Sequence, residues 1–174
     1  MDSVINLAKK IKLVIFDIDG VLTNGTLFIG DGGEEYKAFH SKDGHGMRML
    51  IECGLQAAII TGRKSYVVEH RMKDLGIDIV FQGYRDKRPA FRELLERTGL
   101  RADEIAYMGD DVVDLPVMTQ VGMAIAVSDA HPFVLQHADY ITDKPGGSGA
   151  AREAIETILQ AQGLLQTKLD SYLE

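Results

Sequence analysis

Two hydrophobic patterns alternate along the chain. Short apolar runs rich in valine and isoleucine are typical of strands buried on both faces of a parallel sheet, and they predict strands at 11–16, 55–60, 77–81, 104–109, 122–127 and 139–142. Apolar residues spaced three or four positions apart predict helices between them, at 44–53, 64–75, 87–98, 114–119, 131–136 and 148–162. This order predicts an α/β fold: a doubly wound, Rossmann-like parallel sheet with helices on both faces.

One segment interrupts the alternation. Residues 25–40 carry two short β-like runs around a Gly-Asp-Gly-Gly turn, which predicts a β-hairpin insertion. Apolar side chains fall on both faces of this hairpin: Leu27, Phe28 and Ile29, then Tyr36, Ala38 and Phe39. Because an isolated two-stranded ribbon is unstable in water, we expect it to pack against another surface, and a neighbouring subunit is one candidate.

Size and composition narrow the classes of protein that fit. The 174 residues are expected to form a single domain, 1–174, with a leucine-containing tail at about 163–174 that either docks or frays. The net charge of −7 argues against a broad surface for nucleic acid or an anionic membrane, but not against a small anionic substrate. No apolar stretch has the length of a membrane span and no secretory leader is evident, so we expect a cytoplasmic protein.

Polar residues follow four of the predicted strands. The carboxyl ends of parallel strands share one edge of a sheet, and doubly wound sheets bind ligands there. Five acids, a hydroxyl and a lysine are therefore expected to converge: Asp17, Asp19, Thr61, Lys87, Asp110, Asp111 and Asp114.

This set of residue types suits phosphoryl transfer. Carboxylates clustered without histidine or cysteine favour a hard cation such as Mg²⁺. A metal-bound carboxylate can attack phosphorus to form an aspartyl phosphate, and a second carboxylate can protonate the leaving oxygen and then activate water. Thr61 could hold phosphoryl oxygens, and Lys87 would balance the charge. Each residue alone has a structural explanation, such as a turn or a helix cap, but the ordered set favours a shared site.

In these motifs the chain resembles the haloacid dehalogenase (HAD) superfamily of phosphatases. The superfamily pattern is Asp-x-Asp, a Thr or Ser, a Lys, and an acidic Gly-Asp box, which here begin at Asp17, Thr61, Lys87 and Gly109. The resemblance implies that Asp17 is the nucleophile and Asp19 the general acid/base. It implies that Mg²⁺ is bound by the carboxylates of Asp17 and Asp110 and by the backbone carbonyl of Asp19. Asp111 and Asp114 would mainly contact these ligands rather than the metal.

Members of this superfamily differ in whether they carry a cap domain and where it is inserted. The intervals between the motifs of this chain are too short for one. About 40 residues separate Asp19 from Thr61, and the hairpin and one helix fill them. Only 25 residues lie between Thr61 and Lys87, enough for one helix and one strand. A capless site is exposed, so it either acts on a macromolecule or is closed by a neighbouring subunit. The hairpin favours the neighbouring subunit.

Longer motifs are similar to the family of 3-deoxy-D-manno-octulosonate 8-phosphate (KDO 8-P) phosphatases of lipopolysaccharide synthesis. They include DIDGVLT, GEEYKAFHSKDGHGMR, AIITGRKS and MGDDVVDLPVM, and the similarity runs from about residue 11 to 163. It implies a cytoplasmic, Mg²⁺-dependent homotetramer whose hairpins form a central barrel and whose C-terminal tails reach a neighbour's site. The glycine-rich segment 144–153 either approaches phosphate through its backbone N–H groups or lets such a tail pass close, and we favour the second.

The implied substrate is a sugar acid phosphate, whose carboxylate requires cations beyond Lys87. Arg48, Arg63 and Arg71 are candidates, and Arg63 and Arg71, eight residues apart, are expected to share a helix face. The resemblance implies substrate contacts from Asp19, His40, Ser41, Lys42, Asp43, Gly44, Arg48, Gly62, Arg63, Arg71, Lys87 and Asp111.

Three alternatives remain beside this interpretation. A phosphorelay receiver also combines acids, Thr and Lys, but its acidic pair precedes the phosphorylated aspartate, which is not the order here. A non-catalytic HAD-like oligomerisation module would tolerate loss of Asp17, Asp19 or Lys87, and all three are present. A phosphatase for a nine-carbon keto-sugar acid phosphate would show the same motifs.

Overall fold

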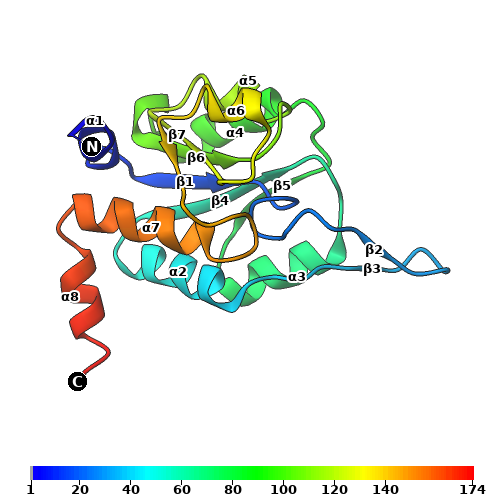
Figure 1. Cartoon of the computed structure of the whole chain (residues 1–174), viewed down its shortest axis with the longest axis horizontal. Helices are drawn as coiled ribbons and strands as arrows, with labels where there is room; N and C mark the ends of the chain where they lie inside the picture. Colours follow the sequence, from blue (N-terminus) through cyan, green and yellow to red (C-terminus); the bar gives the residue numbers. More distant parts are fainter. Residues whose placement is uncertain (1) are drawn as a thin grey trace.

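The computed structural model describes residues 2–174 and confirms the α/β class (Figure 1). Six parallel strands form the central sheet in the order β5-β4-β1-β6-β7-β8. They are β1 (Leu13–Phe16), β4 (Gln56–Thr61), β5 (Ile79–Gln82), β6 (Ile105–Gly109), β7 (Met123–Ala126) and β8 (Tyr140–Ile141). Each predicted strand is present, with bounds within two residues of those expected. Their buried Val, Ile, Ala and Met side chains form the core between the sheet and its helices.

Helices cover both faces of the sheet, and in Figure 1 α2, α3 and α7 lie below it while α4, α5 and α6 lie above. None of the helices within residues 2–174 is long and apolar enough to cross a membrane. The helices are α1 (Asp2–Ala8), α2 (Ser41–Glu52), α3 (Tyr66–Leu75), α4 (Arg88–Thr98), α5 (Leu115–Met118), α6 (Pro132–Leu135), α7 (Ala150–Ala161) and α8 (Leu165–Asp170), with a 3₁₀ turn η1 at Ala102–Glu104.

The strand order places β1 at the point where the chain changes direction across the sheet. From β1 the chain builds β4 and β5 on one side, and then crosses to β6, β7 and β8 on the other. The register aligns Phe16, the last residue of β1, with Ile59 of β4 and Met108 of β6. The carboxyl ends of these three strands therefore lie together, at the switch point where ligands bind in such sheets.

The predicted hairpin is present as β2 (Phe28–Ile29) and β3 (Glu35–Tyr36), paired antiparallel. It extends beyond the carboxyl end of the sheet and away from both helix layers (Figure 1). Its apolar side chains are exposed: Phe28 is 50%, Ile29 63% and Tyr36 67% accessible. No separate cap domain interrupts the described residues 2–174, as expected from the short intervals between the motifs.

The C-terminal tail docks on its own chain through α8. Lys168 forms an ion pair with Glu52 of α2 at 2.7 Å. The rings of Tyr172 and His45 lie 5.4 Å apart between centroids. The tail was expected either to dock or to fray, and it docks as far as Tyr172. Beyond that residue, Leu173 is 86% exposed.

The glycine-rich loop before α7 packs closely on the loop that follows β1. The backbone N–H of Gly147 donates to the carbonyl of Val21 at 2.9 Å. A Cβ atom on Gly146 would lie only 1.8 Å from the carbonyl oxygen of Gly20. Glycine is therefore required at position 146 by backbone contact within the chain itself.

Replacing Gly146 with alanine should destabilise the fold. The added methyl group meets backbone atoms that cannot move away, and overpacking of this kind costs about 1–3 kcal/mol. Thermal unfolding measures the effect, with Ser148→Ala as a control because Ser148 is exposed in the same loop. Equal melting temperatures for the two variants would contradict the close approach.

Candidate active site

Asp17 begins the site at the end of β1. Its backbone N–H donates to the carbonyl of Met108 (3.1 Å), so the residue extends the pairing of β1 with β6. Its side chain is buried, with the residue only 6% exposed, and its Oδ1 accepts from the N–H of Ile18 at 2.7 Å. Burial, followed by the charge of Asp114, raises the pKa of Asp17 to about 6. The pairing of β1 with β6 thus fixes one carboxylate at the switch point.

Lys87 places a buried ammonium group beside this carboxylate. It occupies the N-cap position of α4, makes no side-chain capping bond there, and is 1% exposed. Its Nζ lies 3.0 Å from Oδ2 of Asp17 and 2.6 Å from Oδ1 of Asp114. Burial alone would lower the pKa of Lys87, but the charges of Asp17 and Asp114 outweigh it and raise the pKa. Lys87 therefore stays positively charged.

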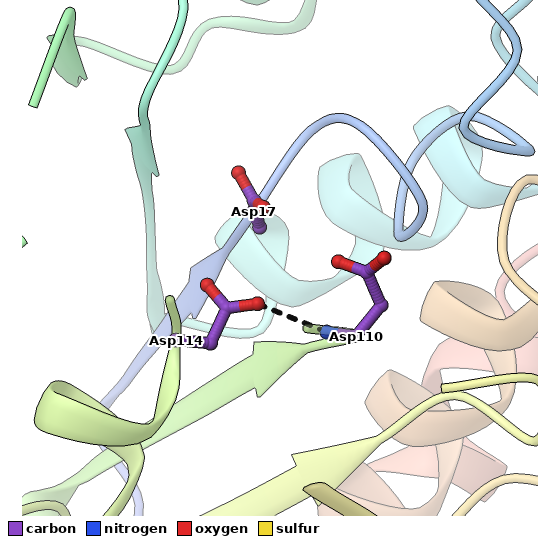
Figure 2. Close-up of side chains that lie close together, drawn as sticks. All are labelled: Asp17, Asp110 and Asp114. Carbon is purple, nitrogen blue, oxygen red and sulfur yellow. Dashed lines mark hydrogen bonds between the residues drawn. The ribbon is translucent and has the colours of Figure 1, made fainter. Parts of the chain in front are cut away.

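Asp114 is fully buried and has no free carboxylate oxygen. Its Oδ1 accepts from Lys87 and from the hydroxyl of Tyr107 (2.7 Å), while Oδ2 accepts from the backbone N–H groups of Asp110 (3.0 Å) and Asp111 (3.2 Å). Figure 2 shows the bond between Asp114 and the backbone of Asp110. Asp114 therefore shapes the loop after β6, and Tyr107, which is not among the predicted site residues, helps to hold Asp114 in place.

Asp110 presents the carboxylate that this loop leaves open. Its Oδ1 is buried and has no hydrogen-bond partner among the described residues. Its carboxylate packs on Gly20, where a Cβ would lie 2.0 Å from Oδ2, and Gly20 also has a positive φ of 95°. Burial, followed by the charges of Asp114 and Asp17, raises the pKa of Asp110 to about 8. A buried carboxylate with no hydrogen-bond partner, such as this one, is suited to coordinate a cation.

The acidic cluster fits a hard divalent cation. Asp17, Asp110 and Asp114 each offer an oxygen within 4.8 Å of the others (Figure 2). Asp114 accepts two hydrogen bonds at each oxygen, whereas each oxygen of Asp17 has one partner and Oδ1 of Asp110 has none among the described residues. Asp17 and Asp110 are therefore the carboxylates with room for a metal. They are the two carboxylates that the family resemblance implies as ligands, and an all-oxygen set is typical of Mg²⁺.

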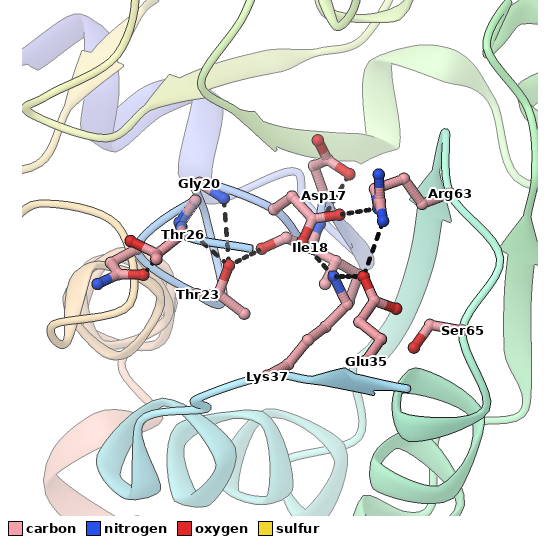
Figure 3. Close-up of polar contacts among 12 residues, drawn as sticks. Asp17, Ile18, Gly20, Thr23, Thr26, Glu35, Lys37, Arg63 and Ser65 are labelled. Carbon is pink, nitrogen blue, oxygen red and sulfur yellow. Dashed lines mark hydrogen bonds and ion pairs between the residues drawn. The ribbon is translucent and has the colours of Figure 1, made fainter. Parts of the chain in front are cut away.

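Asp19 lies outside this cluster and belongs to a second polar network. Three members of that network, Glu35, Lys37 and Arg63, are labelled in Figure 3. Its Oδ1 forms an ion pair with Nζ of Lys37, which follows β3 of the hairpin. Lys37 also contacts Glu35 at 3.2 Å, and Glu35 accepts from Nη2 of Arg63 at 3.0 Å. Lys37 and Glu35 were not predicted as site residues, because a charged residue in a hairpin is ordinarily a solvated surface residue.

The three predicted arginines separate into two places. Arg63 lies in the turn between β4 and α3, since α3 begins at Tyr66, so the expectation that it shares a helix face with Arg71 is wrong. Arg63 instead joins the network of Asp19, its Nε lying 3.8 Å from Oδ2. Arg48 and Arg71 both bind Asp74, Arg48 through the backbone carbonyl (2.7 Å) and Arg71 through the carboxylate (2.9 Å).

The segment from His40 to Gly44 forms the start of α2, which begins three residues earlier than predicted. Asp43 is buried, and its two oxygens accept from the backbone N–H groups of Gly149 (3.2 Å) and Arg152 (2.8 Å) at the start of α7. The side chain of Arg71 packs directly against Gly44, where a Cβ atom would lie 2.3 Å from Nη2 of Arg71. These contacts give Asp43 and Gly44 structural roles, while Ser41 and Lys42 are exposed.

The remaining predicted residues lie at the same sheet edge. Thr61 ends β4 and is 2% exposed, and Gly62 follows it. Asp111 is exposed beside Asp110, and its Oδ1 accepts from the N–H of Val112 at 2.7 Å. The structure thus gathers Asp17, Lys87, Asp110 and Asp114 into direct or near contact. Their catalytic roles stay predictions.

Comparisons with known proteins agree with this architecture. A family profile described as haloacid dehalogenase-like hydrolase matches residues 77–153. The 3-deoxy-D-manno-octulosonate 8-phosphate phosphatase KdsC of Escherichia coli (strain K12) is 47% identical over 162 residues, covering 93% of this chain and 86% of that protein. The crystal structure of the phosphatase of the same name from Yersinia pestis is 47% identical, with a TM-score of 0.94, over 95% of this chain and 89% of that one.

A third relative was solved with ligands. The 3-deoxy-D-manno-octulosonate 8-phosphate phosphatase from Moraxella catarrhalis, in complex with a magnesium ion, a phosphate ion and a KDO molecule, is 39% identical. Its TM-score is 0.96 over 99% of both chains. The chain belongs to the haloacid dehalogenase-like hydrolases and, within them, to the family of the KdsC phosphatases.

The raised pKa values of Asp17 and Asp110 predict how pH and Mg²⁺ affect stability. Without a cation, the folded protein keeps protons on these carboxyls that the unfolded chain has released, so the free energy of unfolding should fall as pH rises from 5 to 8. Mg²⁺ replaces those protons and should raise the melting temperature more at pH 8 than at pH 5. Thermal unfolding with chelator or Mg²⁺ measures both effects, at about 2–4 °C per kcal/mol.

Asp110→Asn is the matched variant for this experiment, because it removes the titrating group and keeps its shape. It should flatten the pH dependence of the chelated protein and reduce the Mg²⁺ effect. The histidines are unchanged in this variant, so they do not contribute to the difference. An equal Mg²⁺ effect at both pH values in the unsubstituted protein would contradict the assignment of Asp17 and Asp110 to a cation.

Proposed function

We propose that this protein is a Mg²⁺-dependent phosphatase that hydrolyses 3-deoxy-D-manno-octulosonate 8-phosphate to the free sugar acid and inorganic phosphate, in lipopolysaccharide synthesis. The observation that carries the proposal is the pairing of buried Asp17 with Lys87 beside Oδ1 of Asp110, which has no partner within residues 2–174, a stretch that also contains no separate cap. The 47% identity to KdsC phosphatases supports the substrate.

The reaction proceeds in two displacements on the residues of this chain. A carboxylate oxygen of Asp17 attacks phosphorus, the bond from phosphorus to the sugar oxygen breaks, and Asp19 gives its proton to that leaving oxygen. Water then attacks the aspartyl phosphate and loses a proton to Asp19, which releases inorganic phosphate and restores the carboxylate of Asp17. Lys87 balances negative charge at Asp17 throughout, and Thr61 is the proposed donor to a phosphoryl oxygen.

The proposed metal site consists of the carboxylates of Asp17 and Asp110 and the backbone carbonyl of Asp19. When bound there, Mg²⁺ offsets the repulsion between the carboxylate of Asp17 and the anionic phosphate. Asp114 acts through the loop it holds rather than as a ligand. Arg63, close to Asp19, is the proposed arginine for the substrate's carboxylate, because Arg48 and Arg71 bind Asp74.

We also propose that the enzyme is a cytoplasmic homotetramer. The exposed apolar hairpin supports assembly, since contiguous exposed apolar side chains mark interaction surfaces. A neighbouring subunit seated against the hairpin would close the capless site, and a C-terminal tail would contribute to it.

A panel of eight- and nine-carbon keto-acid phosphates tests the substrate. The eight-carbon 8-phosphate should give the highest kcat/KM, and hydrolysis of each compound should require Mg²⁺. Asp17→Asn should lower kcat by about 10³-fold or more, because an amide is a poor nucleophile. Absence of Mg²⁺-stimulated phosphate release from any of these compounds would refute the proposed function, and preference for a nine-carbon compound would correct the substrate.

Light scattering tests the assembly. The measured mass should be four times the 19.2 kDa mass of one chain. Ile29→Lys should shift it to smaller species, because Ile29 is 63% exposed on the hairpin and a buried lysine at an interface lacks a partner. Ile5→Lys, which charges an exposed apolar position on α1, is the control. A monomer, or an Ile29→Lys variant with unchanged mass, would contradict the hairpin interface.

A further inference from the structure

The side chain of Lys37 is buried although the residue lies on a projecting hairpin. Its side chain is 2% exposed, whereas that of Asp19, to which it is paired, is 20% exposed. A buried ammonium group is costly unless carboxylates surround it, and Lys37 has two, Asp19 and Glu35. The hairpin therefore places the Lys37 ammonium group, with its two carboxylate partners, beside the loop that follows β1 (Figure 3).

Asp19 depends on this cation for its orientation. The buried carboxylates of Asp114 and Asp43 are each fixed by two backbone N–H groups. Among residues 2–174, by contrast, the contacts to the carboxylate of Asp19 come from two side chains, Lys37 and the more distant Arg63 at 3.8 Å. Removing the Lys37 ammonium would leave this carboxylate without its closest partner.

Lys37 is itself held from two directions. Glu35, two residues earlier in β3, contacts it at 3.2 Å and also accepts from Arg63 of the β4–α3 turn. Asp19, Lys37, Glu35 and Arg63 thus form a ring of two carboxyl groups and two basic groups that links the hairpin to two loops of the sheet edge. Figure 3 labels three of these residues, Glu35, Lys37 and Arg63. Such a ring fixes the Lys37 ammonium in space, and Asp19 with it.

We propose that Lys37 is a positioning residue that aims the Asp19 carboxyl at the leaving oxygen, so that the hairpin controls proton transfer. This inference rests on the proposed function, in which Asp19 protonates the leaving group. When the phosphorus–oxygen bond breaks, its electron pair goes to the sugar oxygen, which takes the proton from Asp19 and leaves as an alcohol. A misaimed Asp19 slows this departure without changing the attack by Asp17.

The leaving group distinguishes this role from others. A sugar alkoxide must be protonated as it departs, whereas p-nitrophenolate is stable enough to leave unprotonated. The value of kcat/KM covers the steps up to departure of the leaving group, so it isolates this event from the later hydrolysis of the aspartyl phosphate.

Lys37→Met keeps the length of the side chain and removes its charge. We expect kcat/KM to fall about 10- to 100-fold for the keto-acid phosphate and equally for a sugar phosphate that lacks a carboxylate, and less than about 3-fold for p-nitrophenyl phosphate. Lys37→Arg should recover most of the loss, and Lys73→Met, at an exposed position on α3, should match the unsubstituted enzyme. In an Asp19→Asn background, Lys37→Met should add little further loss, because the two residues act on one step.

Each other pattern overturns the proposal. A loss confined to the keto-acid phosphate would make Lys37 a binding residue for the substrate's carboxylate, and an equal loss on all three substrates would make it merely structural. Should Lys37→Met fail to fold, Glu35→Gln provides a second test because it weakens one contact of Lys37. It should lower kcat/KM for the same two sugar substrates, by smaller factors, and leave p-nitrophenyl phosphate little affected. If the unsubstituted enzyme hydrolyses none of the substrates, the proposed function fails instead.

Discussion

The buried ammonium group of Lys87 is the interaction on which the site depends. It joins Asp17 at the end of β1 to Asp114 at the start of α5, and it also donates to the hydroxyl of Tyr107 on β6. Without this charge, two buried carboxylates would repel each other at the centre of the sheet edge. With it, Asp114 can bind the backbone of the loop that follows β6, and that loop in turn presents Asp110.

The carboxylates near this point divide according to what occupies their oxygens. Asp114 and Asp43 use both oxygens on hydrogen bonds within the chain, so they fix loops and helix ends. Asp110 keeps a buried oxygen without a partner among residues 2–174, and Asp17 is held by one backbone N–H and Lys87. The open oxygen of Asp110 therefore separates it from the carboxylates that support the site, whereas Asp17, with one partner at each oxygen, is distinguished by its place at the end of β1 beside Asp110.

The hairpin has two different ends. Its outer part exposes Phe28 and Ile29, which suit an interface with another chain, while its base places Lys37 on Asp19. In a capless enzyme, assembly through the outer part would also hold the base in place. The proposed tetramer and the proposed positioning of Asp19 thus have a common structural origin, although the experiments above test them separately.

The sequence by itself determined the sheet, the six helices from α2 to α7 and the edge on which the acids converge, but it did not predict α1 and α8. Hydrophobic periodicity reports burial, and parallel strands necessarily bring their carboxyl ends together, so the positions of Asp17, Lys87 and Asp110 after their strands were enough to group them. The tertiary structure alone decided how these side chains are used. Asp43 caps a helix more than 100 residues away, Arg63 lies before its helix rather than on it, and Lys37 turns inward from a hairpin. Such contacts depend on how loops distant in sequence pack against one another, and local patterns carry no record of that packing.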